Sequence, residues 1–166
     1  MDKHEVTELL TKVADGSISP EDAALRLKML PFKEIEDYAR IDLHRGIRQG
    51  VPEVIYGANK APEHILGIAK GMLENGQETV LITRISPETA QLLQRQLELR
   101  YDHISKTGVI GCIPAPTGKG TIVVATGGTS DIPVAEEAAI TAEMLGNKVT
   151  RLYDVGVSGI HRLLSN

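Results

Sequence analysis

The sequence contains a single cysteine, Cys112, no tryptophan, and only 3% aromatic residues. One cysteine can form neither an internal disulfide nor a cysteine-based metal cluster. The formal net charge is −4, and the chain has no basic block interleaved with aromatic residues. This balance argues against a nucleic-acid-binding surface and favours a small-molecule ligand.

Long apolar runs are also absent. No stretch reaches the roughly 18 apolar residues that a membrane-spanning helix needs, and the charged start Met-Asp-Lys-His-Glu lacks the apolar core of a signal peptide. We therefore expect a soluble, cytoplasmic protein with no membrane partner. With 166 residues, 42% of them hydrophobic, the chain can bury one core or two small ones.

The order of apolar periods and turn residues predicts an α/β protein with four parts. Residues 1–30 form a helical pair, in which Asp15-Gly16 ends the first helix and Ser19 caps the second. Residues 31–113 form a small α/β domain, 114–120 a linker, and 121–166 part of a nucleotide-binding domain. The elements expected in the second part are a strand at 53–56, a helix at 61–73, a strand at 79–83, a helix at 87–99 and an edge strand within 103–112.

The segment Thr121–Ala139, TIVVATGGTSDIPVAEEAA, carries the most information. Ile122 to Ala125 are apolar on both faces, which predicts a buried central parallel strand. Gly127-Gly128 would allow tight turning and close ligand approach, while Asp131 would cap the next helix and Pro133 would lie in its first turn. Free N–H groups at such a helix start attract an anion. An ordinary strand-to-helix connection with capping residues is the alternative.

A second segment completes this unit. Lys148–Val155 is predicted to form the return strand, followed by GVSGIHRLL, which begins a helix. A doubly wound sheet needs several such crossovers. We therefore expect a chain truncated at its C-terminus.

Three motifs in order resemble those of a known family: DLHRGIRQGVPEVIYGANK at 42–60, ATGGTSDIPVAEEAA at 125–139 and YDVGVSGIHRL at 153–163. They are similar to the LarB family of nickel-pincer cofactor biosynthesis proteins, which serve lactate racemase and whose C-terminal part is related to the aminoimidazole ribonucleotide (AIR) carboxylase PurE. The resemblance implies a PurE-like three-layer (α/β/α) parallel-sheet domain. It implies carboxylation of the pyridinium ring of nicotinic acid adenine dinucleotide with CO2, and hydrolysis of its phosphoanhydride. The products are AMP and pyridinium-3,5-biscarboxylic acid mononucleotide.

The resemblance also implies a set of site residues. The relatives place a Gly-Ser-x-Ser-Asp turn over a ribose phosphate, and this chain has a glycine where they have the first serine. His161 matches the acid/base residue, and Arg162 matches a phosphate clamp. The phosphate-binding turn comprises Gly127, Gly128, Thr129, Ser130 and Asp131, the last of which would contact the ribose. A histidine that is merely hydrogen-bonded at a helix start is the alternative for His161.

Charged residues of the first motif are weaker candidates. Arg45 and Arg48 fall on one helical face, either as a solvated surface or, with Lys60, as a diphosphate clamp that the resemblance favours. Glu53 would orient a ring or an Mg²⁺ ion, or be a surface glutamate. Asp42 is expected to cap the helix that carries both arginines.

The mechanism that the resemblance implies uses a cysteine thiolate that adds to the pyridinium ring. Cys112 lies elsewhere in the pattern and is expected to be a small buried hydrophobe, so we expect this chain to lack the catalytic cysteine. No tightly bound cofactor and no structural metal site are expected, with Mg²⁺ as an optional ion, and the partner is a second copy of the chain in a homo-oligomer. Two alternatives stay open: AIR carboxylase itself, and a non-catalytic nucleotide-binding or oligomerisation module.

Overall fold

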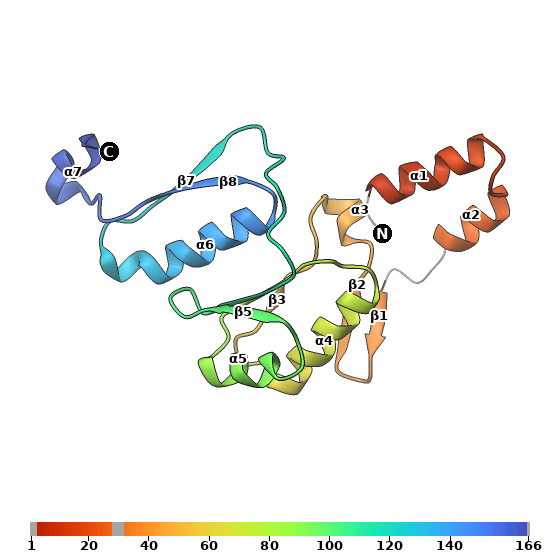
Figure 1. The fold of residues 1–166 in the computed structure, drawn as a ribbon, viewed down its shortest axis with the longest axis horizontal. Helices are drawn as coiled ribbons and strands as arrows, with labels where there is room; N and C mark the ends of the chain where they lie inside the picture. Colours follow the sequence, from red (N-terminus) through yellow and green to blue (C-terminus); the bar gives the residue numbers. More distant parts are fainter. Residues whose placement is uncertain (1–2, 28–31, 166) are drawn as a thin grey trace. The chain divides into compact units, whose positions relative to one another are not determined.

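A computed structural model describes residues 3–27 and 32–165 and confirms a mixed α/β fold (Figure 1). The chain divides into two compact units, one made of Met1–Glu53 and Leu66–Gln77, the other of Val54–Ile65 and Glu78–Asn166. We describe each unit by itself. The four predicted parts of the chain stay a prediction. No helix in the described ranges has the length and apolar character needed to cross a membrane.

The first unit begins with the predicted helical pair. Helix α1 spans Lys3–Ala14 and α2 spans Pro20–Leu27. The expected cap is present, because the Asp22 N–H donates to Ser19 Oγ at 3.0 Å and the Ser19 hydroxyl donates to the Asp22 carboxylate at 2.8 Å. Gly16 ends the first helix in the left-handed region, at φ 80°. Local sequence signals therefore determine both helices.

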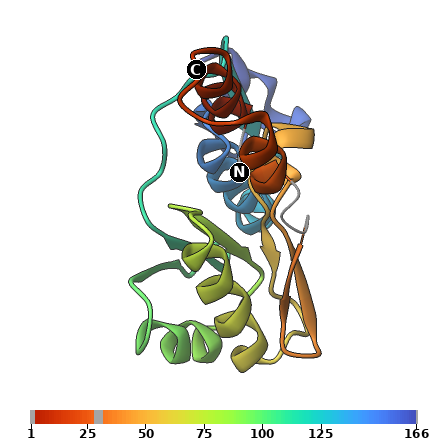
Figure 2. The same ribbon diagram turned by 90° about the vertical axis from the view of Figure 1, so that its right-hand side faces the viewer.

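A β-hairpin that the sequence did not predict follows. Strands β1 (Phe32–Ile35) and β2 (Ala39–Asp42) pair antiparallel and form the narrow ribbon seen in Figure 2. The hairpin lies against helix α4 (Pro62–Glu74), where a Cβ on Gly71 would come within 2.6 Å of Ile35 and 2.7 Å of Ile41. Glycine in this helix thus makes room for the apolar face of the hairpin. The short helix α3 (Arg45–Gln49) comes next.

The second unit contains a four-stranded sheet in the order β3-β4-β6-β5. Strand β3 spans Ile55–Tyr56, β4 Val80–Thr83, β5 Leu99–Asp102 and β6 Thr107–Ile110. Only β3 and β4 pair parallel, and β4 and β6 are buried along their whole length.

The expectation of an edge strand within 103–112 was wrong. Strand β6 is an inner strand, and β5 lies at the edge. The predicted helix ends early: α5 spans Pro87–Gln94, which frees Leu99 to begin β5. The turn between β5 and β6 is closed by Asp102, whose carboxylate accepts from the Ser105 N–H at 2.7 Å and hydroxyl at 2.8 Å.

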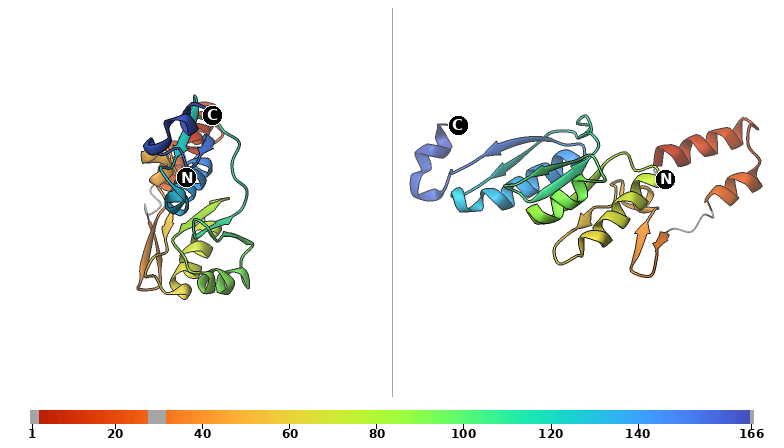
Figure 3. Two further views of the ribbon diagram at one scale, coloured as in Figure 1. Left: turned by 90° about the vertical axis from the view of Figure 1, so that its left-hand side faces the viewer. Right: turned by 60° about the horizontal axis from the view of Figure 1, so that its bottom comes forward.

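The C-terminal part of the same unit is a parallel pair of strands with one helix. Strand β7 (Thr121–Ala125) pairs with β8 (Lys148–Leu152), and α6 (Ile132–Met144) connects them. The right view of Figure 3 shows α6 running alongside both strands. The prediction of a buried β7 was wrong: Ile122 is 40% exposed and Val123 58%, because this sheet has two strands and its single connecting helix leaves one face open.

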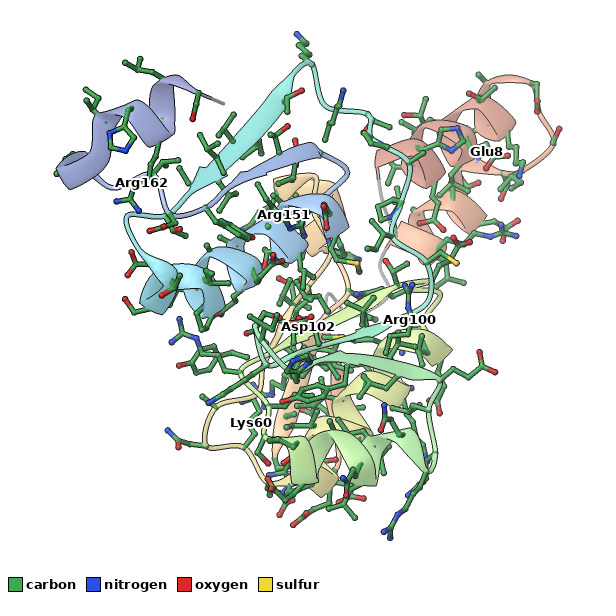
Figure 4. All side chains as sticks on the ribbon, turned by 60° about the vertical axis from the view of Figure 1, so that its left-hand side comes forward. Glu8, Lys60, Arg100, Asp102, Arg151 and Arg162 are labelled. Atoms are coloured by element: carbon green, nitrogen blue, oxygen red, sulfur yellow. The ribbon has the colours of Figure 1, made fainter. Side chains whose placement is uncertain are left out.

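Ion pairs join α6 to its surroundings. Arg151 on β8 donates from Nε to Glu136 at 3.0 Å and from Nη1 to Glu143 at 2.5 Å, and Figure 4 shows it reaching toward α6. Arg84, which follows β4, donates to Glu137 at 3.0 Å and lies 5.5 Å from the centre of the Tyr56 ring. These contacts fix α6 against β8 and against the end of the four-stranded sheet.

Tyr153, just after β8, gives a test of this packing. Burial raises the pKa of Tyr153 to about 12, and the hydrogen bond that its hydroxyl donates to Glu136 acts in the same direction. An unfolded tyrosine has a pKa of about 10, so this stabilisation is complete below pH ~10 and is lost as the pH rises through the folded value. We expect the difference in Tm between the wild type and Tyr153→Phe to shrink from pH 9 to pH ~12. Parallel curves in thermal melting would contradict this assignment.

Candidate phosphate-binding site

Two loops lie at the carboxyl ends of the parallel strands β7 and β8. We name Thr126–Asp131 the glycine bend and Tyr153–Gly159 the return bend. The glycine bend contains a 3-10 turn at Thr129–Asp131 before α6, and the return bend ends in another, Val157–Gly159, before helix α7 (Ile160–Leu164). Ligands of open α/β sheets bind at this edge, and the sequence predicts its phosphate site in the same place.

Hydrogen bonds to the hydroxyl and to the carbonyl of Thr126 hold the two bends together. The Asp154 N–H donates to Thr126 Oγ1, and the Val155 N–H donates to the Thr126 carbonyl, each at 3.0 Å. A Cβ on Gly156 would lie 2.4 Å from the carbonyl oxygen of Gly127. The two bends therefore form one constellation in which Gly156 is required by close backbone approach.

Asp131 does not act as the predicted cap of α6. It stands at the N-cap position but makes no side-chain cap hydrogen bond there, and its backbone is already helical, with φ −86° and ψ −13°. Its carboxylate instead accepts from the Gly128 N–H at 3.0 Å and closes the glycine bend. The 3-10 turn causes this correction, because it moves Asp131 one turn into the helical segment. A contact of Asp131 with ribose stays a prediction.

The glycine bend is open to a ligand. A Cβ on Gly128 would meet no heavy atom within 4 Å, and Thr129 and Ser130 are exposed. Within the described part of the chain, the amides of Thr129 and Ser130 donate no hydrogen bond to protein. Neither glycine of the pair has a left-handed φ, so this bend does not use glycine for its backbone angles. Gly127 and Gly128 instead keep their part of the bend free of side chains, so that a ligand can approach its backbone.

Arg162 lies beside the return bend. Its Nη1 donates to Asp154 Oδ2 at 2.6 Å, with side chains 38% and 48% exposed, and Figure 4 shows it projecting from α7. A Cβ on Gly159 would lie 2.6 Å from Arg162 Nε, so that buried glycine makes room for the guanidinium. His161, the preceding residue, is exposed. Arg162, the predicted phosphate clamp, thus lies near the carboxyl ends of the strands and forms an ion pair with the Asp154 carboxylate.

The candidates of the first motif have structural contacts. Glu53 accepts from the Asp42 N–H at 2.8 Å through Oε2 and is half-buried, and a contact of its carboxylate with a ring or an Mg²⁺ ion stays a prediction. Asp42 does not stand at the N-cap of α3, which is His44; its Oδ1 accepts from the His44 N–H at 3.1 Å. The turn before α3 is two residues longer than the capping prediction assumed.

The remaining cations lie in different units. Arg45 is half-buried in the first unit, and its Nε is buried without a hydrogen-bond partner among the described residues. The side chain of Arg48 lies outside the described residues. Lys60, in the second unit, is exposed in the loop between β3 and α4 (Figure 4). A shared diphosphate clamp of these three stays a prediction.

Cys112 is exposed, so the expectation of a buried cysteine was wrong. The reason is local: β6 ends at Ile110, and Gly111 takes φ 80°, at a position where a Cβ would lie 2.3 Å from the Glu78 carbonyl oxygen, which turns the chain out of the sheet. In the described ranges, no group of three His, Cys, Asp or Glu side chains could hold a metal ion.

Sequence reasoning missed Thr126 and Asp154. Thr126 is 5% exposed and follows the apolar strand, and Asp154 has a left-handed φ of 57° just after the return strand. Their positions at the carboxyl ends of two adjacent parallel strands were the available signal.

A comparison with known protein families matches the part of the chain that precedes the two bends. Residues 32–111 match the LarB/PurE-like N-terminal domain. The chain contains a LarB/PurE-like N-terminal domain. Within it lie the hairpin, α3 and the four-stranded sheet, whereas both bends fall outside residues 32–111.

The chain is also similar to an uncharacterized protein of Methanocaldococcus jannaschii. The two are 35% identical over 162 residues, which is 94% of this chain and 63% of that protein. The chain therefore spans less than two thirds of the length of this relative.

Gly128 gives a prediction for the glycine bend. Its backbone, with φ −153° and ψ 175°, suits any residue, and its Cβ position is open. We expect Gly128→Ser to change the free energy of unfolding by less than ~0.5 kcal/mol and to tighten nucleotide binding several-fold, about one added hydrogen bond. Calorimetry that compares Gly128→Ser with Gly128→Ala measures how much the hydroxyl contributes to nucleotide affinity. Equal affinities of the two variants would contradict the predicted hydrogen bond.

Proposed function

We propose that the protein to which this LarB/PurE-like domain belongs carboxylates the pyridinium ring of nicotinic acid adenine dinucleotide with CO2 and hydrolyses its phosphoanhydride. The observation that carries the proposal is the open glycine bend, hydrogen-bonded to the return bend that Arg162 contacts, at the carboxyl ends of β7 and β8. Proteins of the LarB/PurE-like type are largely enzymes, which supports a catalytic function.

The described residues suggest a division of tasks. Thr129 and Ser130 are exposed just before helix α6, and backbone amides at such a helix start favour an anion. Arg162 supplies a planar fork of donors that matches a phosphate. His161, exposed next to it, would transfer a proton during cleavage of the phosphoanhydride. Mg²⁺ bound by the diphosphate of the substrate would assist without a protein-built site.

Calorimetry tests the binding step. We expect the protein to bind nicotinic acid adenine dinucleotide and AMP, and to bind neither nicotinic acid nor adenosine, since both lack phosphate. Binding of aminoimidazole ribonucleotide in preference to the dinucleotide would instead support AIR carboxylase. No binding of any of the phosphate-bearing compounds would overturn the proposal.

Product analysis tests the chemistry. Incubation with the dinucleotide and bicarbonate should release AMP, and His161→Gln should lower the rate without weakening binding. Nucleotide binding without AMP would favour the second candidate, a non-catalytic binding module. One observation favours the binding module for this chain: Cys112 lies after β6 and outside both bends, so neither bend contains a cysteine that could add to the pyridinium ring.

We also propose self-association through the open face of the β7–β8 sheet. Val123 is 58% exposed there, and among the described strands β7 and β8 pair only with each other, which leaves one edge of each unpaired. Light scattering would show a mass above the 17.9 kDa of one chain, and Val123→Lys would reduce it. A monomer at micromolar concentration would contradict this assembly.

A further inference from the structure

Arg162 starts the argument because a phosphate clamp works best when it is held in place before the ligand arrives. An arginine that is 38% exposed has many rotamers, and ordering them on binding reduces affinity. The hydrogen bond from Arg162 Nη1 to Asp154 Oδ2, at 2.6 Å, restricts this freedom. The buried Gly159 leaves the space that the guanidinium occupies.

Asp154 is itself held in an unfavourable backbone conformation. Its φ of 57° is left-handed, which costs free energy for a residue other than glycine. The surrounding contacts maintain it: the Asp154 N–H donates to Thr126 Oγ1, and the next N–H, of Val155, donates to the Thr126 carbonyl. The carboxylate that contacts Arg162 is therefore positioned through Thr126.

Thr126 connects the two bends. It is 5% exposed, its N–H donates to the Leu152 carbonyl at 3.0 Å, and it directly precedes Gly127. A single buried hydroxyl thus links the start of the glycine bend to the residue that orients Arg162. A serine would keep that acceptor, whereas valine would remove it at similar volume.

We propose that Asp154 and Thr126 are positioning residues of the phosphate site: Asp154 orients the guanidinium of Arg162, and Thr126 fixes Asp154 relative to the glycine bend. This inference rests on the proposed function, because it assumes that a phosphate binds there. Neither residue touches the ligand. Their effect on binding passes through Arg162.

A double-mutant cycle tests the coupling, with AMP as the probe and calorimetry as the readout. We expect Asp154→Ala to weaken AMP binding about tenfold, as for the loss of a charged hydrogen bond. In an Arg162→Ala background the same change should have less than a twofold effect, because the residue to be oriented is gone. Unchanged or tighter binding by Asp154→Ala, or an equal loss in both backgrounds, would overturn the proposal.

The matched pair Thr126→Ser and Thr126→Val tests the second residue. Serine should retain wild-type affinity, and valine should lose several-fold, with both variants folded as judged by thermal melting. Equal affinities of the two would overturn the role of Thr126.

Order at Arg162 is measured without any ligand by the ¹⁵N heteronuclear NOE of its Nε–H group. The NOE should fall in Asp154→Ala and Thr126→Val and stay high in Thr126→Ser. An unchanged NOE in Asp154→Ala overturns the inference. If the wild type binds no AMP, the proposed function fails, while this measurement still decides whether Asp154 orders Arg162.

Discussion

Gly57→Ala should lower the free energy of unfolding by about 3 kcal/mol, the upper range for a group forced into a packed core. A Cβ there would lie 2.4 Å from Ile85 Cγ2 and 2.8 Å from the Thr83 carbonyl oxygen. The Gly57 N–H also donates to that carbonyl at 2.8 Å, at the end of the parallel pair β3 and β4. The side chain has no direction in which to relax, because one of the two neighbours is backbone. Urea denaturation followed by circular dichroism measures the loss.

Gly120→Ala is the matched control for this change. Gly120 has no left-handed φ, and a Cβ on it would meet nothing within 4 Å. Its stability should therefore stay within ~0.5 kcal/mol of the wild type. If Gly57→Ala were as stable as Gly120→Ala, the close approach of β3 to Thr83 and Ile85 would be wrong.

Gly156→Ala should weaken nucleotide binding more than tenfold, since a shift of even an ångström in a binding group has effects of about this size. Its Cβ would lie 2.4 Å from the carbonyl oxygen of Gly127, and neither partner has a flexible side chain that could move away. The return bend would have to separate from the glycine bend, and Arg162 would move with it. Titration calorimetry with AMP measures the loss of affinity.

The control for Gly156→Ala is again Gly120→Ala, which lies before β7 and should bind like the wild type. The clash lies in loops and not in the core, so we expect Gly156→Ala to remain folded, which thermal melting checks. Wild-type affinity in a folded Gly156→Ala protein would show that the two bends act independently.

The sequence predicted those parts of the fold that local interactions decide. The helices α1, α2 and α4 and the strand β4 were predicted from apolar periodicity, and the cap at Ser19 from the spacing to Asp22. Each depends on residues within a few positions in the chain. The hairpin β1–β2 was missed because it packs against α4, a helix that begins at Pro62, far along the chain from the end of the hairpin at Asp42, and this contact cannot be seen in the local sequence.

Burial was predicted less well because it depends on what covers a surface. The apolar run of β7 indicated a buried strand, but burial needs neighbours on both faces and both edges, and a two-stranded sheet with one helix does not provide them. Cys112 was placed inside for its residue type, whereas the left-handed Gly111 turns the chain outward.

The sequence by itself determined the α/β class and the turn before α6, and of the three motifs that resemble the LarB family the one at 42–60 lies within the matched residues 32–111. These follow from residue order over short distances. Only the tertiary structure decided that Thr126 and Asp154 are joined, that Asp131 closes its own bend, and that Arg162 is paired. The physical reason is that Thr126 and Asp154 are brought together by the parallel pairing of β7 with β8, and the composition of neither segment specifies that contact.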